Sequence, residues 1–286
     1  MRITFCFIML TIFLAAGTAA GAPVGNIADP SILTTGKFSG ERAYGFIAGI
    51  ETEFVSNRSF ADQDNKLKFN FYGVKAGAVL KDNIFIYTDL GIGEMEDNKR
   101  IPDWDPDRNV AYVRINRVEI ETDPNFVFGF GITALMYEYK IEEDVYFRIG
   151  LDVKYRRISL ETDSATITLY NYDAGRTEVY SASYTMNMDE YQGALSVSYQ
   201  YENFVPYIGF KISDCNGDEK VALKDFESRN SEFGFGNIDY SGNFYTHGKK
   251  GMFLGLTYYI SNTFSIGIEG RERDEEAFNI TAQMRF

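Results

Sequence analysis

The residues of this chain that could do chemistry are few and scattered. His247 is the only histidine, and Ser241 lies six residues before it, with acidic residues nearby. A hydrolase needs a nucleophile with a positioned base, or a polarised water molecule. A lone histidine outside any catalytic motif is most often a polar loop residue. We therefore predict no catalytic residue and no enzyme, and keep a hydrolase built on His247 as the weakest alternative.

Two short segments have the alternating oxygen ligands that a hard cation such as calcium prefers. Residues 103–107 carry three alternate carboxylates, and Asp214, Asn216 and Asp218 form a second set. Neither segment continues into the glycine and the distal glutamate of a calcium loop, so solvated acidic loops are the better interpretation. The sequence also contains no phosphate-binding loop, zinc motif or dinucleotide motif. We therefore predict no metal and no cofactor.

The charge balance and the cysteines exclude further classes. The chain has 28 basic and 41 acidic residues and a formal net charge of −13. Binding to phosphate backbones needs a basic face, so nucleic acid is not an expected partner. Cys6 lies in the apolar N-terminal run, which leaves Cys215 alone and allows no internal disulfide in an exported chain. We expect a plain thiol at Cys215, with pairing between molecules as the alternative.

The N-terminus has the pattern of a secretory signal peptide. One arginine precedes an apolar run over residues 3–16, and small residues follow up to Ala20. This order predicts a signal peptide over residues 1–20, cleaved after Ala20. An uncleaved anchor helix is the alternative, but the run is short for a membrane span. No later segment has 18 consecutive apolar residues, so the sequence predicts no helical span.

Alternation of apolar and polar residues dominates the rest of the chain and indicates strands. Across residues 145–156 every odd position is apolar or aromatic, whereas the even positions hold Arg, Asp, Lys, Gly and one Tyr. A composition of 24 Phe, 20 Tyr and 26 Gly also suits strands. The pattern predicts ten strands, over residues 42–55, 67–80, 84–95, 125–139, 145–157, 190–201, 205–213, 250–260, 264–273 and 277–286.

Strand length and loop length distinguish a membrane barrel from a soluble sandwich, which would also alternate. Most predicted strands have ten or more residues, enough to cross a membrane at a tilt. Short and long connections follow one another, as in outer-membrane barrels. The short connections are 81–83, 142–144, 202–204 and 261–263, and the long ones are 56–66, 96–124, 158–189 and 214–249.

We therefore predict an all-β fold, a transmembrane antiparallel up-and-down β-barrel of about 10 strands with a range of 8–12. Its short turns would be periplasmic and its long loops extracellular. Residues 21–41 would form a periplasmic N-terminal segment, and residues 42–286 the barrel, in the cell outer membrane of a Gram-negative-type bacterium. Strand-like pieces at 112–120, 166–172 and 178–184 are expected to be hairpins or strand extensions above the membrane.

The polar faces of the strands predict the lumen wall. Nine glycines lie opposite the apolar faces, where small residues relieve crowding inside a narrow barrel. The charged lumen-lining residues are predicted to be Glu51, Lys75, Asp89, Arg148, Asp152, Lys154, Arg156, Lys211, Glu269, Arg271 and Arg285. Such charges set selectivity if a water path exists, and they plug the lumen if they pair across it.

The last strand ends on an aromatic residue. Phe286 and Met284 share its apolar face, and we take them as the signal for the barrel-assembly machinery. This strand must pair with residues near 42–55 to close the sheet. Outer-membrane lipid is then the expected neighbour of its apolar face.

Several segments resemble the chlamydial major outer membrane porin family. They are residues 23–32 at the start of the exported chain, the hairpin 190–213 with its Pro-Tyr-Ile-Gly, and the C-terminal residues 265–286. This chain is shorter and poorer in cysteine than that family. The resemblance implies a porin with a structural role in the envelope, and homo-oligomers.

Two functions follow as expectations. The first is porin-like passive diffusion of small hydrophilic solutes, weakly favouring anions. The alternative is a closed-lumen structural or surface-interaction barrel, adhesin-like or receptor-like, acting through its long acidic loops. Barrels of eight strands are filled by their side chains and those of sixteen leave a channel, so ten strands lie near the filled end.

Overall fold

The computed structural model describes residues 44–58, 67–80, 84–99, 113–171, 176–223, 239–273 and 275–286. The predicted signal peptide and the predicted periplasmic segment lie outside these residues. Among the described residues no helix is long and apolar enough to span a bilayer. The strands are β1 (Tyr44–Arg58), β2 (Leu67–Leu80), β3 (Ile84–Lys99), β4 (Val113–Glu121), β5 (Asn125–Glu142), β6 (Val145–Asn171), β7 (Arg176–Tyr201), β8 (Phe204–Leu223), β9 (Asp239–Tyr259), β10 (Phe264–Glu272) and β11 (Glu275–Arg285).

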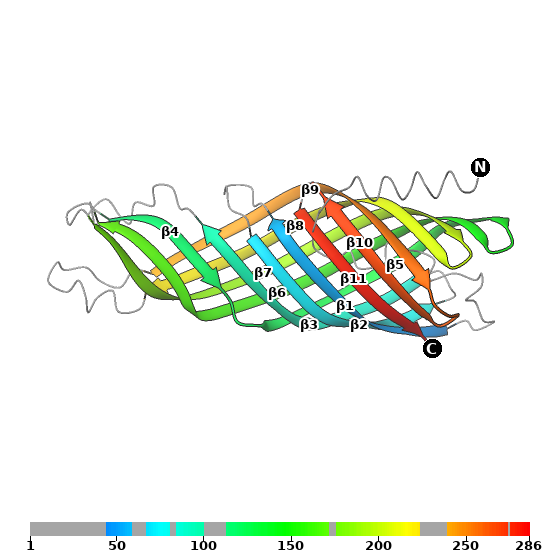
Figure 1. The fold of residues 1–286 in the computed structure, drawn as a ribbon, viewed down its shortest axis with the longest axis horizontal. Helices are drawn as coiled ribbons and strands as arrows, with labels where there is room; N and C mark the ends of the chain where they lie inside the picture. Colours follow the sequence, from blue (N-terminus) through cyan, green and yellow to red (C-terminus); the bar gives the residue numbers. More distant parts are fainter. Residues whose placement is uncertain are drawn as a thin grey trace.

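Ten of these strands close into an antiparallel ring. Figure 1 shows this barrel from the side. The ring runs β1-β2-β3-β5-β6-β7-β8-β9-β10-β11 and returns to β1. β11 closes it on β1, with Phe54 opposite Phe278 and Ile47 opposite Arg285. β4 stands outside the ring and pairs with the ends of β3 and β6. The predicted all-β barrel of about ten strands is confirmed, and so is the pairing of the last strand with the first.

The two ends of the barrel differ, because several strands run on far past the ring at one end. β5–β6, β7–β8 and β9–β10 are joined by short turns at the end where β11 finishes, and we call this the short-turn end. At the opposite end β6 continues to Asn171, β7 starts at Arg176, β8 reaches Leu223 and β9 starts at Asp239. Much of the sequence predicted as loop at 158–189 and 214–249 is therefore strand. We call this part the projection: β4 with residues 157–171, 176–189, 213–223 and 239–250.

An apolar band covers the outside of the ring. Outward side chains such as Phe46, Phe126 and Phe210 are 60% exposed or more, and aliphatic residues lie between them on every ring strand. A soluble protein rarely exposes a continuous apolar belt of this extent. Because apolar side chains of a membrane barrel face lipid, this belt defines the surface that meets the bilayer.

Glycines on the inner face let large side chains cross the interior. A Cβ at Gly255 would lie 2.0 Å from the Tyr207 ring, and one at Gly131 would lie 2.2 Å from the Tyr87 hydroxyl. Both distances are far below van der Waals contact, so only glycine fits at these two positions. At these two positions the inward glycines make room for neighbouring tyrosine side chains.

Candidate functional site: the interior of the barrel

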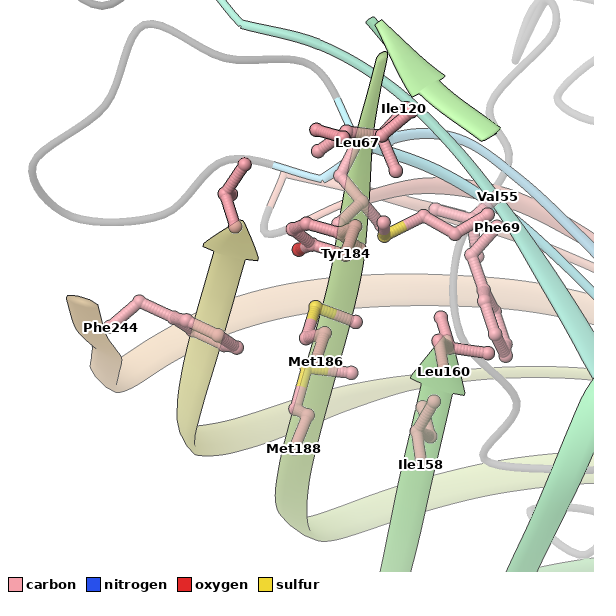
Figure 2. Packing of buried hydrophobic residues seen from close by; sticks show 14 of the residues in the cluster. Val55, Leu67, Phe69, Ile120, Ile158, Leu160, Tyr184, Met186, Met188 and Phe244 are labelled. Carbon is pink, nitrogen blue, oxygen red and sulfur yellow. The ribbon is translucent and has the colours of Figure 1, made fainter. Parts of the chain in front are cut away.

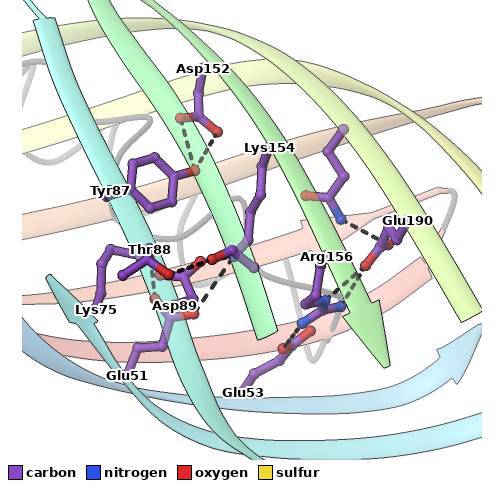
Figure 3. A network of polar contacts seen from close by, with 12 residues as sticks. Glu51, Glu53, Lys75, Tyr87, Thr88, Asp89, Asp152, Lys154, Arg156 and Glu190 are labelled. Atoms are coloured by element: carbon purple, nitrogen blue, oxygen red, sulfur yellow. Dashed lines mark hydrogen bonds and ion pairs between the residues drawn. The ribbon is translucent and has the colours of Figure 1, made fainter. Parts of the chain in front are cut away.

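Charged side chains form a network of polar contacts inside the barrel, part of which Figure 3 shows. Ten of the eleven predicted lumen residues are buried inside the barrel with 0–2% of their surface exposed, and Arg148 among them lies near the turn between β5 and β6. Arg285 differs, since it lies half-buried at the end of β11, at the short-turn rim. We call these ten residues, with Glu53, Glu190, Glu275 and Glu138, the charged layer.

One cluster of four charges joins strands that are not neighbours in the ring. Lys75 Nζ lies 2.7 Å from Glu51 Oε2 and 3.6 Å from Asp89 Oδ1. Lys154 Nζ lies 2.6 Å from Asp89 Oδ2 and 3.9 Å from Glu51 Oε1. Lys154 comes from β6, whereas its two partners come from β3 and β1. These ion pairs therefore cross the lumen.

A hydroxyl-bonded carboxylate lies beside this cluster. Asp152 accepts hydrogen bonds from the Thr133 hydroxyl at 2.8 Å and from the Tyr87 hydroxyl at 3.2 Å. Lys75 Nζ lies 5.0 Å from the centre of the Tyr87 ring, within reach of a cation–π contact. Tyr87 on β3 thus connects the lysine on β2 with the carboxylate on β6.

Arg156 makes the widest bridge of the charged layer. Its Nη1 donates to Glu53 at 2.8 Å, and its Nε and Nη2 donate to Glu190 Oε2 at 3.0 and 2.7 Å. Gln192 donates to the other oxygen of Glu190 at 2.9 Å. The partners of Arg156 come from β1 and β7, so its guanidinium connects three strands, β1, β6 and β7. Charge-assisted bonds of this kind are the strong ones in proteins.

The remaining charges pair in the same way. Arg148 donates to Glu138 and to Gln200, each at 2.7 Å. The Tyr207 hydroxyl on β8 donates to Glu269 on β10 at 3.0 Å, across β9. Glu269 also contacts Arg271, and Lys211 contacts Glu275.

Four acids of the charged layer were missed in the list drawn from the sequence. Glu53 follows Glu51 at the same parity, and Glu190 and Glu275 share the parity of inward neighbours, so alternation could have found them. Glu138 could not be found in this way. A β-bulge between Leu135 and Tyr137 shifts the parity of β5 just before it.

Apolar side chains lie beside the charged layer and beyond it toward the projection. Tyr207, Phe253 and Ala194 form one small cluster, and Ile47, Val79, Phe85 and Tyr87 form another. A larger outer apolar cluster lies toward the projection, and Figure 2 shows its packing. Its members include Val55, Leu67, Phe69, Met95, Ile158, Leu160, Tyr184, Met186, Met188, Cys215 and Phe244.

The two faces of a strand exchange polarity between the ring and the projection, as β7 shows most clearly. In the ring its buried positions are polar, with Glu190 and Gln192, and Tyr191 lies outside at 51% exposure. In the projection the buried positions are Met186 and Met188, and Asn187 faces outward. The same exchange occurs on β6 and β8, and at the ends of β2 and β3 nearest the projection. A polar outside and an apolar inside are the pattern of a water-soluble β-structure.

This exchange explains why the strands predicted from the sequence are shorter than β6, β7, β8 and β9. Alternation continues through the border, but the apolar residues move to the other parity. The hydrophobic stripe that marks a lipid-facing strand therefore stops at Tyr155 on β6 and at Tyr191 on β7. The strand-like pieces predicted at 166–172 and 178–184 belong to β6 and β7, except for Tyr172, which lies outside the described residues.

The other candidate residues do not assemble into a site. Cys215, expected in a polar loop, is buried in the outer apolar cluster. Asp214, Asn216 and Asp218 alternate along β8 rather than converging on a point. Residues 103–107 and the side chain of His247 lie outside the described part of the chain. Within the described residues no three His, Cys, Asp or Glu side chains are grouped to hold a metal ion.

Solved structures of outer-membrane proteins share this fold. The outer membrane protease OmpT from Escherichia coli aligns at 14% identity over 85% of this chain and 94% of its own, with a TM-score of 0.46. The CymD monoaromatic hydrocarbon channel aligns at 7% identity over 94% of this chain and 93% of its own, with a TM-score of 0.35. A major outer membrane protein from Thermus thermophilus aligns at 8% identity over 86% of this chain and 100% of its own, with a TM-score of 0.31. No protein-family model and no curated protein sequence matches the chain.

The comparison with OmpT contradicts the prediction that this chain is not an enzyme, because a protease is built on a barrel of this kind. The absence of a catalytic motif from the sequence does not by itself exclude a reaction. The likeness concerns the fold alone and assigns this chain neither a reaction nor a catalytic residue. The chain thus has the fold of outer-membrane β-barrels, and its function must be inferred from its own interior and surfaces.

Proposed function

We propose that this chain is a closed-lumen barrel of the outer membrane that acts at the cell surface through its projection, as a structural or surface-interaction element. The observation that carries the proposal is the charged layer, whose ion pairs span the lumen between β1, β3, β6 and β7. Water reaches 2% or less of the ten predicted lumen side chains within it. A charged layer of this kind stabilises the barrel and does not provide a path for solutes.

Porin-like diffusion, the first expectation from the sequence, needs a continuous water path. The charged layer and the outer apolar cluster lie across that path in series. An ion would have to break several buried ion pairs and then cross a layer of apolar side chains. The geometry therefore supports the closed-lumen alternative better than diffusion.

The orientation and the site of action follow from the two ends. The short turns and the assembly signal, Phe286 and Met284, belong on the periplasmic side, and the projection then stands outside the cell. Met284 and Phe286 are 42% and 65% exposed on the outer wall, where the barrel-assembly machinery could bind them. A rigid sheet above the bilayer is suited to present recognition loops to partners outside the cell.

Liposome swelling tests the closed lumen. Protein reconstituted in vesicles, with an open porin as the positive control, is exposed to small sugars. We expect a swelling rate equal to that of protein-free vesicles. A swelling rate that rises with the amount of protein and falls with sugar size would restore the diffusion function and refute the proposal.

A further inference from the structure

The outward face of β6 and β7 has three successive rows at the border between the ring and the projection. Val153 lies opposite Gly193, Tyr155 opposite Tyr191, and Arg157 opposite Asp189. Rows two residues apart on a strand are about 7 Å apart. An apolar row, an aromatic row and a charged row thus follow one another over roughly 14 Å.

The first row contains a notch in the lipid-facing wall. A Cβ built at Gly193 would meet no atom within 4 Å, so the space outside this glycine is open. Val153 and Ile212, its neighbours on β6 and β8, are each 54% exposed, and Leu195, next on β7, is 49% exposed. These three side chains stand on three sides of a gap as wide as one missing side chain. A hydrocarbon chain fits such a gap, because the gap is apolar and faces the bilayer.

The second row supplies an aromatic edge above the notch. The rings of Tyr155 and Tyr191 lie 5.2 Å apart, and Phe130 on β5 continues the row at 5.1 Å from Tyr155. Tyrosine rings prefer the level of lipid headgroups, where one end is apolar and the other wet. The row therefore places the notch just below the headgroup level.

The third row supplies a cation at the level of the headgroups. Arg157 is 56% exposed, and its Nη1 lies 3.6 Å from Asp189 Oδ1, which is longer than a hydrogen bond. Asp189 meanwhile accepts a 2.6 Å hydrogen bond from the Tyr155 hydroxyl. With more than half of its side chain exposed, the planar guanidinium offers the fork of donors that suits a phosphate.

We propose that this face is the seat of one phosphate-bearing membrane lipid, with an acyl chain in the Gly193 notch and the phosphate at Arg157. The two contacts lie along one line on the barrel wall, in the order in which a lipid presents its tail and its headgroup. The seat does not depend on the state of the lumen, so the closed-lumen proposal can fail without affecting it.

Native mass spectrometry of the full chain, purified in neutral detergent, tests the proposal. The probes are phosphatidylglycerol and phosphatidylcholine, each added at matched concentrations. We expect one retained lipid, with phosphatidylglycerol held about tenfold better, since its net negative charge is not offset by a choline. Arg157→Gln should reduce the retention of phosphatidylglycerol to that of phosphatidylcholine. Lys220→Gln, which changes an equal charge higher on the projection, should leave the preference intact.

A second variant tests the notch itself. Gly193→Leu fills open space, so it should leave the thermal unfolding midpoint of the protein unchanged or higher, yet it should abolish the retention of both lipids. Equal retention by this variant and the parent protein would overturn the proposal. Release of the bound lipid by inorganic phosphate alone would also overturn it, because it would indicate a site for the free anion rather than a seat for a lipid.

Discussion

Removing Arg156 should be among the most damaging single changes in this barrel. The Arg156 side chain is 1% exposed, and its guanidinium lies between the carboxylates of Glu53 and Glu190, which are also buried. Arg156→Met keeps most of the volume but removes the guanidinium that bridges these two buried carboxylates. Breaking a buried ion pair in this way costs about 3–5 kcal/mol, whereas an ion pair in contact with water is worth about 1 kcal/mol or less.

The neighbouring residue supplies a matched control. Arg157 faces outward, is 56% exposed, and lies 3.6 Å from its nearest carboxylate. Arg157→Met should therefore lower the free energy of unfolding by about 1 kcal/mol at most. The difference between the two variants isolates burial, because residue type, strand and substitution are the same.

Urea unfolding in phospholipid vesicles, followed by far-UV circular dichroism, measures both losses by linear extrapolation. A triple variant, Arg156→Met with Glu53→Gln and Glu190→Gln, should recover more than half of the loss, since the two carboxylates that Arg156 bridges are neutral in it. Losses that agree within about 1 kcal/mol for Arg156→Met and Arg157→Met would refute the reasoning, because they would mean that water fills the lumen around Arg156.

Four further experiments test other parts of the structure. Gly255→Ala should destabilise the barrel by about 1–3 kcal/mol in the same urea assay, because its Cβ would overlap the Tyr207 ring, and a neutral result would contradict the packing of the interior. Leu195→Arg should cost about 2–4 kcal/mol on the lipid face, while Asn187→Arg on the projection of the same strand should cost almost nothing; equal costs would place the membrane border elsewhere. Met188→Ala should cost about 2–5 kcal/mol if the projection has a true apolar core, and a loss under about 0.5 kcal/mol would contradict that core. Deleting Phe286 should reduce the amount of folded barrel in the outer membrane, measured by heat-modifiable gel mobility, and unchanged assembly would remove its assigned role.

The ring itself was predictable because membrane strands repeat one simple pattern. Outward residues must be apolar and inward ones polar or small, so the parity of Phe147, Ile149 and Leu151 against Arg148 and Asp152 fixed both faces of β6 from sequence alone. Short turns then fixed the number of hairpins. The closing pair of β1 and β11 followed from topology.

The projection was harder to predict because it obeys the opposite rule. Beyond Tyr191 the surroundings change from lipid to water, and the side that must be apolar changes with them. The period of two persists, with Met186 and Met188 on one side and Asn187 on the other. In the projection, however, the apolar side is the inner one, whereas in the ring it is the outer one. A search for this change of phase, rather than for the end of alternation, would have predicted the full length of each of the strands β6, β7, β8 and β9.

The partners within the charged layer could not be predicted from the sequence. Arg156 and Glu53 are separated by 103 residues and come from opposite walls. Alternation states which way each side chain points but not how the ring is sheared. The shear decides which inward residues meet at one level, and it is set by all ten strand registers together.

Single-channel recording in a planar bilayer tests the closed lumen most directly. Refolded protein is added to one side, and insertion is verified by heat-modifiable mobility of the recovered protein. The sealed interior predicts no discrete conductance steps above the bare-bilayer background at any salt concentration. Reproducible steps that scale with salt concentration would contradict it, because they would require a water path through the charged layer and the outer apolar cluster.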